Sequence, residues 1–155
     1  MGLIRILVDG FSLLHSWPEL APGKARHSEA ARDELISVLA QYSQVCGTPI
    51  TVVFDGAGRR GGNVQNPTKS VEVIYSRANQ TADDLIERAA QRLVAYGEVL
   101  VVTDDFPERD MVSFVGAMYQ SCLGFIQTFE AEMADLHREI KNRNFRERSQ
   151  FKRNR

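Results

Sequence analysis

The sequence alternates short, continuously apolar segments with longer segments whose apolar residues recur at helical spacing. The apolar segments span residues 3–9, 49–55, 70–76 and 98–105, and the amphipathic segments span 27–47 and 81–97. Strands that are apolar on both faces are typical of a parallel sheet with helices on both sides. We therefore predict an α/β fold: a three-layer α/β/α sandwich with a mainly parallel central sheet.

The last third of the chain is less regular. Residues 106–121 mix Pro, Gly and apolar residues, and they predict a short helix or turn followed by an irregular or strand-like piece. After Ser121 an apolar residue returns every three or four positions: Ile126, Phe129, Met133, Leu136 and Ile140. This stripe predicts a helix that packs on the sheet. The alternative is a homodimer in which the C-terminal helix of a second copy covers the stripe.

The composition is that of one folded domain. The chain has 155 residues, of which 43% are hydrophobic and 25% charged. It has no apolar run of about 18 residues and no signal-peptide pattern, so we expect a cytoplasmic protein with no membrane partner. Cys46 and Cys122 lack C-x-x-C spacing, which argues against zinc and redox motifs and predicts packing roles.

Charge is unevenly distributed along the chain. Residues 141–155 hold seven Lys or Arg and one Glu, which leaves about −7 on the rest of a chain whose net charge is −1. We predict a domain over residues 1–142 and a basic C-terminal tail over 143–155. Its basic residues with Phe145 and Phe151 suit contact with an RNA backbone and stacked bases, and a solvated terminus is the alternative.

Aspartates close three of the apolar segments and begin the second amphipathic segment: Asp9, Asp55, Asp104, Asp105, Asp83 and Asp84. The carboxyl ends of parallel strands meet at one edge of a sheet, where ligands bind in open α/β folds. Carboxylates brought this close repel one another unless a cation neutralises them. The pattern therefore predicts a site for Mg²⁺ or Mn²⁺, ions that support phosphodiester cleavage.

Two of these acidic pairs also fit structural roles. Thr81 and Asp84 match a capping box, which makes Asp83 the better candidate ligand. Asp104 or Asp105 can cap the element that follows, and we expect the first of them to belong to the site.

Asp9 has the fewest structural alternatives of all these acids. The three histidines lack metal-ligand spacing, and His15 is predicted to pack beside Trp17 in a loop rather than to shuttle a proton or contact phosphate.

The long polar segment 56–69 contains GAGRRG, which matches the G-x-G-x-x-G pattern of dinucleotide-binding sites. Pro67 and the absence of a helical pattern after it argue against that interpretation. Arg59, Arg60 and Lys69 instead favour a clamp on a phosphate backbone, and a solvated turn is the alternative.

Four stretches resemble the YacP-like branch of the NYN domains, a group within the PIN-like nuclease superfamily. They span residues 6–20, 52–56, 71–90 and 101–105, and the phrase V-E-V-x-[YF] followed by T-A-D is the most specific. The resemblance covers most of positions 3–140. It implies a PIN-like fold and a metal-dependent ribonuclease with an acidic pocket.

The resemblance also implies roles for individual residues. It makes Asp9, Asp83 and Asp104 the catalytic metal ligands, and Asp55 matches an acid often found in the family. Ser12 stands where the family usually has Asn, a change that alters how substrate or water is positioned.

We therefore expect an endoribonuclease that uses Mg²⁺ or Mn²⁺ at Asp9, Asp83 and Asp104. Asp55 and Asp105 complete the metal site, and the residues behind it are Ser12, Asp84 and Thr103. The residues expected to hold RNA are Arg59, Arg60, Lys69, Lys141, Arg143 and Arg146. One alternative, favoured by Ser12, is a non-catalytic RNA-binding or assembly module, and another is a small-molecule phosphatase that uses the same pocket.

Overall fold

The computed structural model describes residues 2–56, 63–65 and 67–153. Its strands are β1 (Leu3–Asp9), β2 (Ile50–Phe54), β3 (Asn63–Gln65), β4 (Val71–Tyr75), β5 (Glu98–Val102) and β6 (Met118–Gln120). Its helices are α1 (Gly10–His15), α2 (Glu29–Cys46), α3 (Ala82–Leu93), α4 (Phe106–Phe114) and α5 (Cys122–Arg153). The predicted α/β fold is confirmed.

The strands form one sheet in the order β3-β4-β2-β1-β5-β6. All neighbouring pairs are parallel except β3, which runs antiparallel to β4 at one edge. From β1 the chain first adds strands on one side, through β2 and β4, and then on the other, through β5 and β6. Ligands of open α/β sheets bind where the strand order reverses in this way, at the carboxyl ends of the strands.

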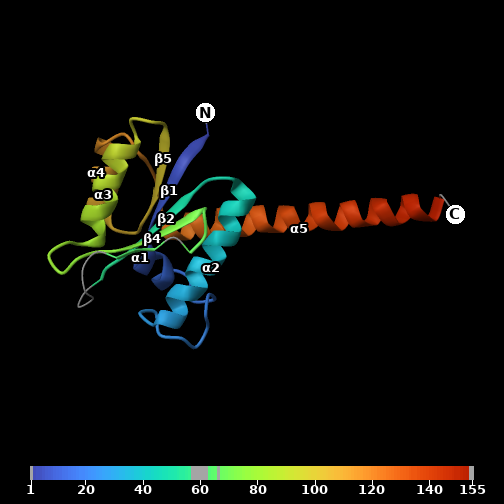
Figure 1. The fold of residues 1–155 in the computed structure, drawn as a ribbon, viewed down its shortest axis with the longest axis horizontal. Helices are drawn as coiled ribbons and strands as arrows, with labels where there is room; N and C mark the ends of the chain where they lie inside the picture. The colour runs from blue at the N-terminus through green and yellow to red at the C-terminus, as the bar shows by residue number, and fades with distance from the viewer. Residues whose placement is uncertain (1, 57–62, 66, 154–155) are drawn as a thin grey trace.

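Helices cover both faces of the sheet (Figure 1). Ile6 and Val8 of β1 face one core, with residues of α1, α2 and α5, whereas Leu7 faces a second core, with residues of α3 and α4. Side chains alternate between the two faces along a strand. Asp9 therefore continues the side of Leu7, toward α3 and α4.

Several element boundaries differ from those expected. The helix predicted over 81–97 ends at Leu93, and the strand predicted over 98–105 ends at Val102. The short helix α1 and the edge strand β3 were not predicted. Arg59 and Arg60 lie outside the residues that the structure describes.

Helix α5 packs on the domain only at its beginning and then extends away from it as an arm (Figure 1). The side chains of Cys122, Phe125 and Ile126 are buried, and the ring centroid of Phe129 lies 5.1 Å from that of Trp17. Ile140 is 50% exposed. The predicted apolar stripe therefore packs on the domain over its first turns, whereas Ile140 at its end is half exposed.

The arm continues without a break through residues 142 and 143 to Arg153. The division into a domain over 1–142 and a tail over 143–155 stays a prediction. None of the helices in the described ranges has the length and apolar character needed to cross a bilayer. The cytoplasmic location also stays a prediction.

Candidate metal centre

Asp9 ends β1 and at the same time caps α1. Its Oδ2 accepts a hydrogen bond from the Ser12 hydroxyl at 2.9 Å, and its Oδ1 accepts a longer one from the Ser12 backbone N–H at 3.4 Å. Asp9, expected to have the fewest structural alternatives among the acids, therefore does have a structural role as the cap of α1. Ser12 thus holds the carboxylate of Asp9 in place.

The turn from β1 into α1 requires glycine at position 10. A Cβ atom there would lie 2.4 Å from Cε1 of Phe54, whose ring is fully buried. The Asp-Gly pair thus lets helix α1 begin directly over β2, which keeps the Asp9 carboxylate at the edge of the sheet.

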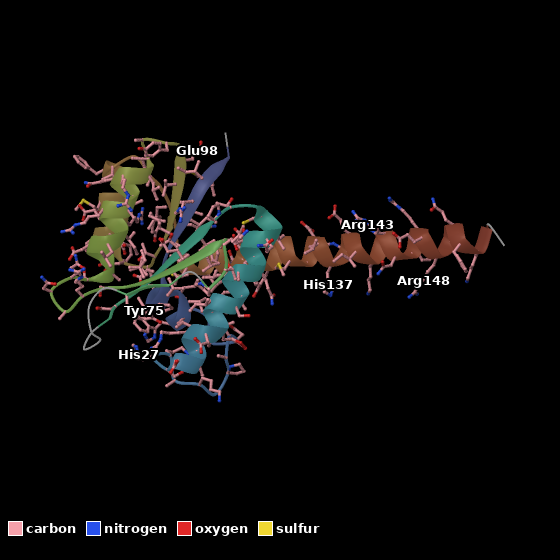
Figure 2. The ribbon with its side chains drawn as sticks, in the orientation of Figure 1. His27, Tyr75, Glu98, His137, Arg143 and Arg148 are labelled. Atoms are coloured by element: carbon pink, nitrogen blue, oxygen red, sulfur yellow. The ribbon has the colours of Figure 1, made fainter. Side chains whose placement is uncertain are left out.

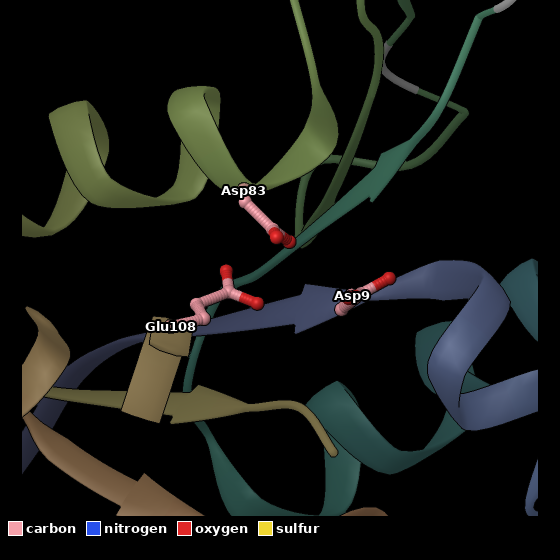
Figure 3. Close-up of side chains that lie close together, drawn as sticks. All are labelled: Asp9, Asp83 and Glu108. Carbon is pink, nitrogen blue, oxygen red and sulfur yellow. The ribbon is translucent and has the colours of Figure 1, made fainter. Parts of the chain in front are cut away.

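Asp83 lies in the first turn of α3, where the predicted capping box is confirmed. Thr81 Oγ1 accepts the Asp84 N–H at 3.1 Å, and Asp84 Oδ2 accepts the Thr81 N–H at 3.2 Å. Asp84 is therefore used by the cap. The Asp83 carboxylate points toward Asp9 and Glu108 (Figure 3). Burial raises the pKa of Asp83, and the nearby carboxylates of Asp105 and Asp9 raise it further.

Glu108 supplies a carboxylate that the sequence analysis did not select. It lies in the first turn of α4, is 4% exposed, and its Oε2 accepts a hydrogen bond from Thr103 Oγ1 at 2.8 Å. Its Oε1 is buried and has no hydrogen-bond partner among the described residues. Burial, followed by the neighbouring Asp83 carboxyl, raises the pKa of Glu108 to about 9.

The three acids Asp9, Asp83 and Glu108, which we call the acidic triad, come from β1, α3 and α4 (Figure 3). Each offers one carboxylate oxygen, and these oxygens lie within 4.8 Å of one another. Three hard oxygen donors, one residue with a buried unpaired oxygen, and their mutual repulsion all fit a divalent cation. The acidic triad can therefore bind such an ion.

Burial also raises the pKa of Asp9, while its hydrogen bonds from Ser12 and Thr103 lower it and Asp105 raises it again. All three triad carboxyls thus have raised pKa values in the absence of a cation. A bound divalent ion would favour their charged forms.

A pocket of about 450 Å³ lies at the carboxyl ends of the strands. Asp9 and Asp83 line it, together with Phe11, Ser12, His15, Asp55 and Asp104. Four of the six predicted acids therefore line one pocket, although they do not all belong to one cluster.

Asp104 lines this pocket but is not a member of the acidic triad. Its Oδ2 accepts a hydrogen bond from Ser16 Oγ at 2.6 Å, and its Oδ1 accepts one from the backbone N–H of Cys122 at 2.9 Å. The side chain thus ties the end of α1 to the start of α5. Its role as a metal ligand stays a prediction.

Asp55 and Asp105 also have partners in the fold. Asp55 Oδ1 accepts a hydrogen bond from Ser76 Oγ at 3.0 Å, and Asp105 caps α4 by accepting the Glu108 N–H at 3.2 Å. Asp105 is close enough to raise the pKa values of Asp9 and Asp83. Their roles in holding the metal stay predictions.

The spacing of Asp105 and Glu108 in the sequence indicates a helix cap rather than a metal ligand. Asp105 and Glu108 are spaced as in a capping box, in which the side chain three residues into the helix would accept the N–H of the cap residue. Here the Asp105 N–H donates to Thr103 Oγ1 at 3.2 Å instead. The Glu108 side chain therefore takes no part in the cap and lies beside Asp9 and Asp83.

Four of the residues expected to bind RNA fall in the described part of the chain, and they lie apart from this pocket. Lys69 precedes β4, so it lies at the amino end of the strands, opposite the carboxylates. Lys141, Arg143 and Arg146 are exposed on the arm of α5, where Figure 2 labels Arg143. Their contact with RNA stays a prediction.

His15 is the last residue of α1 rather than a loop residue. Its ring centroid lies 5.2 Å from that of His27, whereas Trp17 packs against Phe129. Thr103, expected behind the metal ligands, is fully buried, and its hydroxyl lies within hydrogen-bond distance of both Asp9 Oδ2, at 3.2 Å, and Glu108 Oε2, at 2.8 Å.

Comparisons with known proteins agree with this fold. The sequence matches the family described as the YacP-like NYN domain over residues 6–155. It is 33% identical over 137 residues to the uncharacterized protein YacP of Bacillus subtilis (strain 168), which covers 88% of this chain and 81% of that protein.

Two crystal structures from the same organism share the fold. Rae1 (YacP) from Bacillus subtilis is similar with a TM-score of 0.75 and 32% identity, covering 92% of this chain and 81% of that one. A point mutant of Rae1 (YacP) has the same TM-score and identity, and covers 90% of this chain and 82% of that one.

Proposed function

Because the chain belongs to the YacP-like NYN domain family, which is nuclease-like, we propose that it is a metal-dependent endoribonuclease that hydrolyses RNA phosphodiester bonds. The observation that carries this proposal is the convergence of Asp9, Asp83 and Glu108 beside an open pocket. Carboxylates in this arrangement are suited to hold an ion that acts on a phosphate group.

The residues that would hold Mg²⁺ or Mn²⁺ are those of the acidic triad, with Glu108 in the role predicted for Asp104. When bound, the ion lowers the pKa of water and offsets negative charge on the oxygen that leaves phosphorus. Glu108 must give up its proton for this, because its pKa is raised to about 9 without an ion.

The other residues of the site position the reacting groups. Ser12 and Thr103 fix the carboxylate of Asp9 by hydrogen bonds at 2.9 and 3.2 Å. Asp55 and Asp104 line the pocket, and there they would orient the attacking water. In the reaction, a bond forms between the water oxygen and phosphorus as the bond from phosphorus to a ribose oxygen breaks.

Positive charges away from the pocket would hold the RNA backbone. Lys141, Arg143 and Arg146 lie on the exposed arm, and Lys69 lies near β4. With Arg59 and Arg60, they supply the electrostatic attraction that a site made of carboxylates lacks.

The test is cleavage of labelled RNA in the presence of Mn²⁺. We expect internal cuts that disappear on chelation and in Asp83→Asn and Glu108→Gln. Asp110→Asn is the matched control, since Asp110 is an exposed acid on the same helix as Glu108. Thermal melting of each variant shows that the fold is intact.

The alternative of a non-catalytic RNA-binding module is favoured by Ser12, which departs from the family pattern. It predicts that RNA binds to the wild type but stays whole with Mn²⁺. Release of phosphate from nucleotides without RNA cleavage would instead indicate the phosphatase.

A further inference from the structure

A series of aromatic rings leads from the core of the domain to the wall of the acidic pocket. In spatial order the rings belong to Tyr75, Phe54, Phe11, His27 and His15. Successive ring centroids are separated by 5.6, 5.2, 5.1 and 5.2 Å. Figure 2 labels Tyr75 and His27, which lie at the same end of the domain.

The series changes from buried to exposed along its length. Tyr75 and Phe54 are buried, Phe11 is half-buried, and the two histidines are exposed. The first rings are part of the core. The exposed histidines bury little surface, so the stability of the core does not explain why aromatic rings continue into solvent.

The exposed end of the series lies beside the acidic triad. Phe11 and His15 line the same pocket as Asp9 and Asp83. Both rings are carried by α1, the helix that Asp9 caps. The positions of Phe11 and His15 relative to the Asp9 carboxylate are therefore fixed by a single short helix.

His27 is held against this wall by its neighbour in the chain. The Arg26 guanidinium donates hydrogen bonds to the backbone carbonyls of Leu14 at 3.3 Å and of Trp17 at 3.1 Å. These bonds tie the loop before α2 to the end of α1. The rings of His15 and His27 are thus arranged before any ligand binds, which lowers the entropic cost of binding.

We propose that Phe11, His15 and His27 form a nucleobase-binding subsite, in which an unpaired base of the RNA stacks beside the phosphate at the acidic triad. This inference rests on the proposed function and names its substrate as single-stranded RNA. Aromatic side chains bind unstacked bases through their faces, and such contacts tolerate different sequences. A base inside a duplex has both faces covered and does not enter this subsite.

An imidazolium that contacts a phosphate is the competing explanation for the same residues. The substitution His15→Phe separates the two, because it keeps an aromatic face and removes the positive charge. Stacking predicts that His15→Phe binds RNA as tightly as the protein with His15 intact. A phosphate contact predicts that His15→Phe binds RNA as weakly as His15→Ala.

The experiment measures binding of a single-stranded oligoribonucleotide that carries a fluorescent purine analogue. Full-length Glu108→Gln protein is used so that the RNA stays intact. We expect stacking to quench the fluorescence, and His15→Ala with His27→Ala to weaken binding by about tenfold and to abolish the quenching. Tyr96→Ala is the control, because Tyr96 is an exposed aromatic residue in the turn before β5, at the opposite end of the sheet. Glu98 marks that end in Figure 2.

Unchanged affinity and quenching in the double histidine variant would overturn the inference, and so would His15→Phe that binds as weakly as His15→Ala. Circular dichroism of each variant checks the fold. If wild-type protein cuts RNA but the variants bind it equally well, the subsite is wrong and the nuclease stands. If nothing cuts RNA but quenching depends on the two histidines, the nuclease is wrong and the subsite stands.

Discussion

The hydroxyl of Thr103 lies 2.8 Å from Oε2 of Glu108. The same hydroxyl lies 3.2 Å from Oδ2 of Asp9, so one buried side chain after β5 positions two of the three carboxylates of the acidic triad. Residues that orient metal ligands in this way affect the metal nearly as much as the ligands themselves.

Thr103→Val keeps the shape of this side chain and removes its hydroxyl. We expect it to weaken binding of Mn²⁺ by about 10 to 100-fold, as calorimetry would measure, and to slow RNA cleavage in parallel. Thr103→Ser, which retains the hydroxyl, is the control and should bind Mn²⁺ much more tightly than Thr103→Val. Equal Mn²⁺ affinity for wild type and Thr103→Val would show that the hydroxyl does not position the ligands.

The raised pKa of Glu108 predicts how stability depends on pH in the absence of metal. The pKa is about 9 in the folded protein and close to 4.5 in the unfolded chain, so between these values the folded state binds more protons. The free energy of unfolding therefore falls as the pH rises through this window. The raised pKa values of Asp9 and Asp83 act in the same direction.

Urea denaturation in the presence of a chelator, across this pH range, measures the effect. Glu108→Gln cannot ionise, so its stability should decline less steeply with pH than that of the wild type. Saturating Mn²⁺ should also flatten the decline, because the cation favours the charged carboxylates. Parallel pH profiles for wild type and Glu108→Gln would contradict the assigned pKa.

Gly10→Ala should destabilise the fold, because its Cβ would lie 2.4 Å from the Phe54 ring. That ring is fully buried and contacts the rings of Phe11 and Tyr75. We expect a loss of roughly 1 to 3 kcal/mol in the free energy of unfolding. Gly2→Ala, where a Cβ would meet no atom within 4 Å, is the control and should unfold like the wild type in urea.

The arm of α5 should control how RNA binding depends on salt. Replacing Lys141, Arg143 and Arg146 together by Gln removes three charges, and we expect the slope of log affinity against log salt to become shallower by about 2. Arg88→Gln with Arg92→Gln, on α3, is the comparison variant. If both sets of substitutions change the slope equally, the arm is not the RNA-binding surface.

The fold followed from the sequence because its strands are apolar on both faces. The segments at 3–9, 49–55, 70–76 and 98–105 all contain strands of the sheet, and four of the selected acids line one pocket. Those features can be predicted because they depend on the periodicity of strands and on the geometry of parallel sheets.

Other features depend on contacts that a sequence pattern does not reveal. The six-residue helix α1 is too short to show periodicity, and this is why the capping role of Asp9 was missed. The acids were selected because they close apolar segments or begin an amphipathic one, and Glu108 does neither. Its burial beside Thr103 and Asp83 arises only when α4 folds against α3.

The end of α5 shows a different limit. Ile126 and Ile140 belong to the same apolar stripe, but one is 6% exposed and the other 50%. The stripe predicts a helix correctly, although it does not show how far the domain extends along that helix. A composition rich in Lys and Arg after Lys141 is equally compatible with a helix and with an irregular tail.

The most direct test of the account is a crystal soaked in Mn²⁺ and measured for anomalous scattering. We predict a peak bonded to oxygens of Asp9, Asp83 and Glu108 at about 2.2 Å, with water completing the octahedron. No peak among these residues at saturating Mn²⁺, or a peak held by Asp55 and Asp104 without Glu108, would contradict the assignment of the acidic triad as the metal centre.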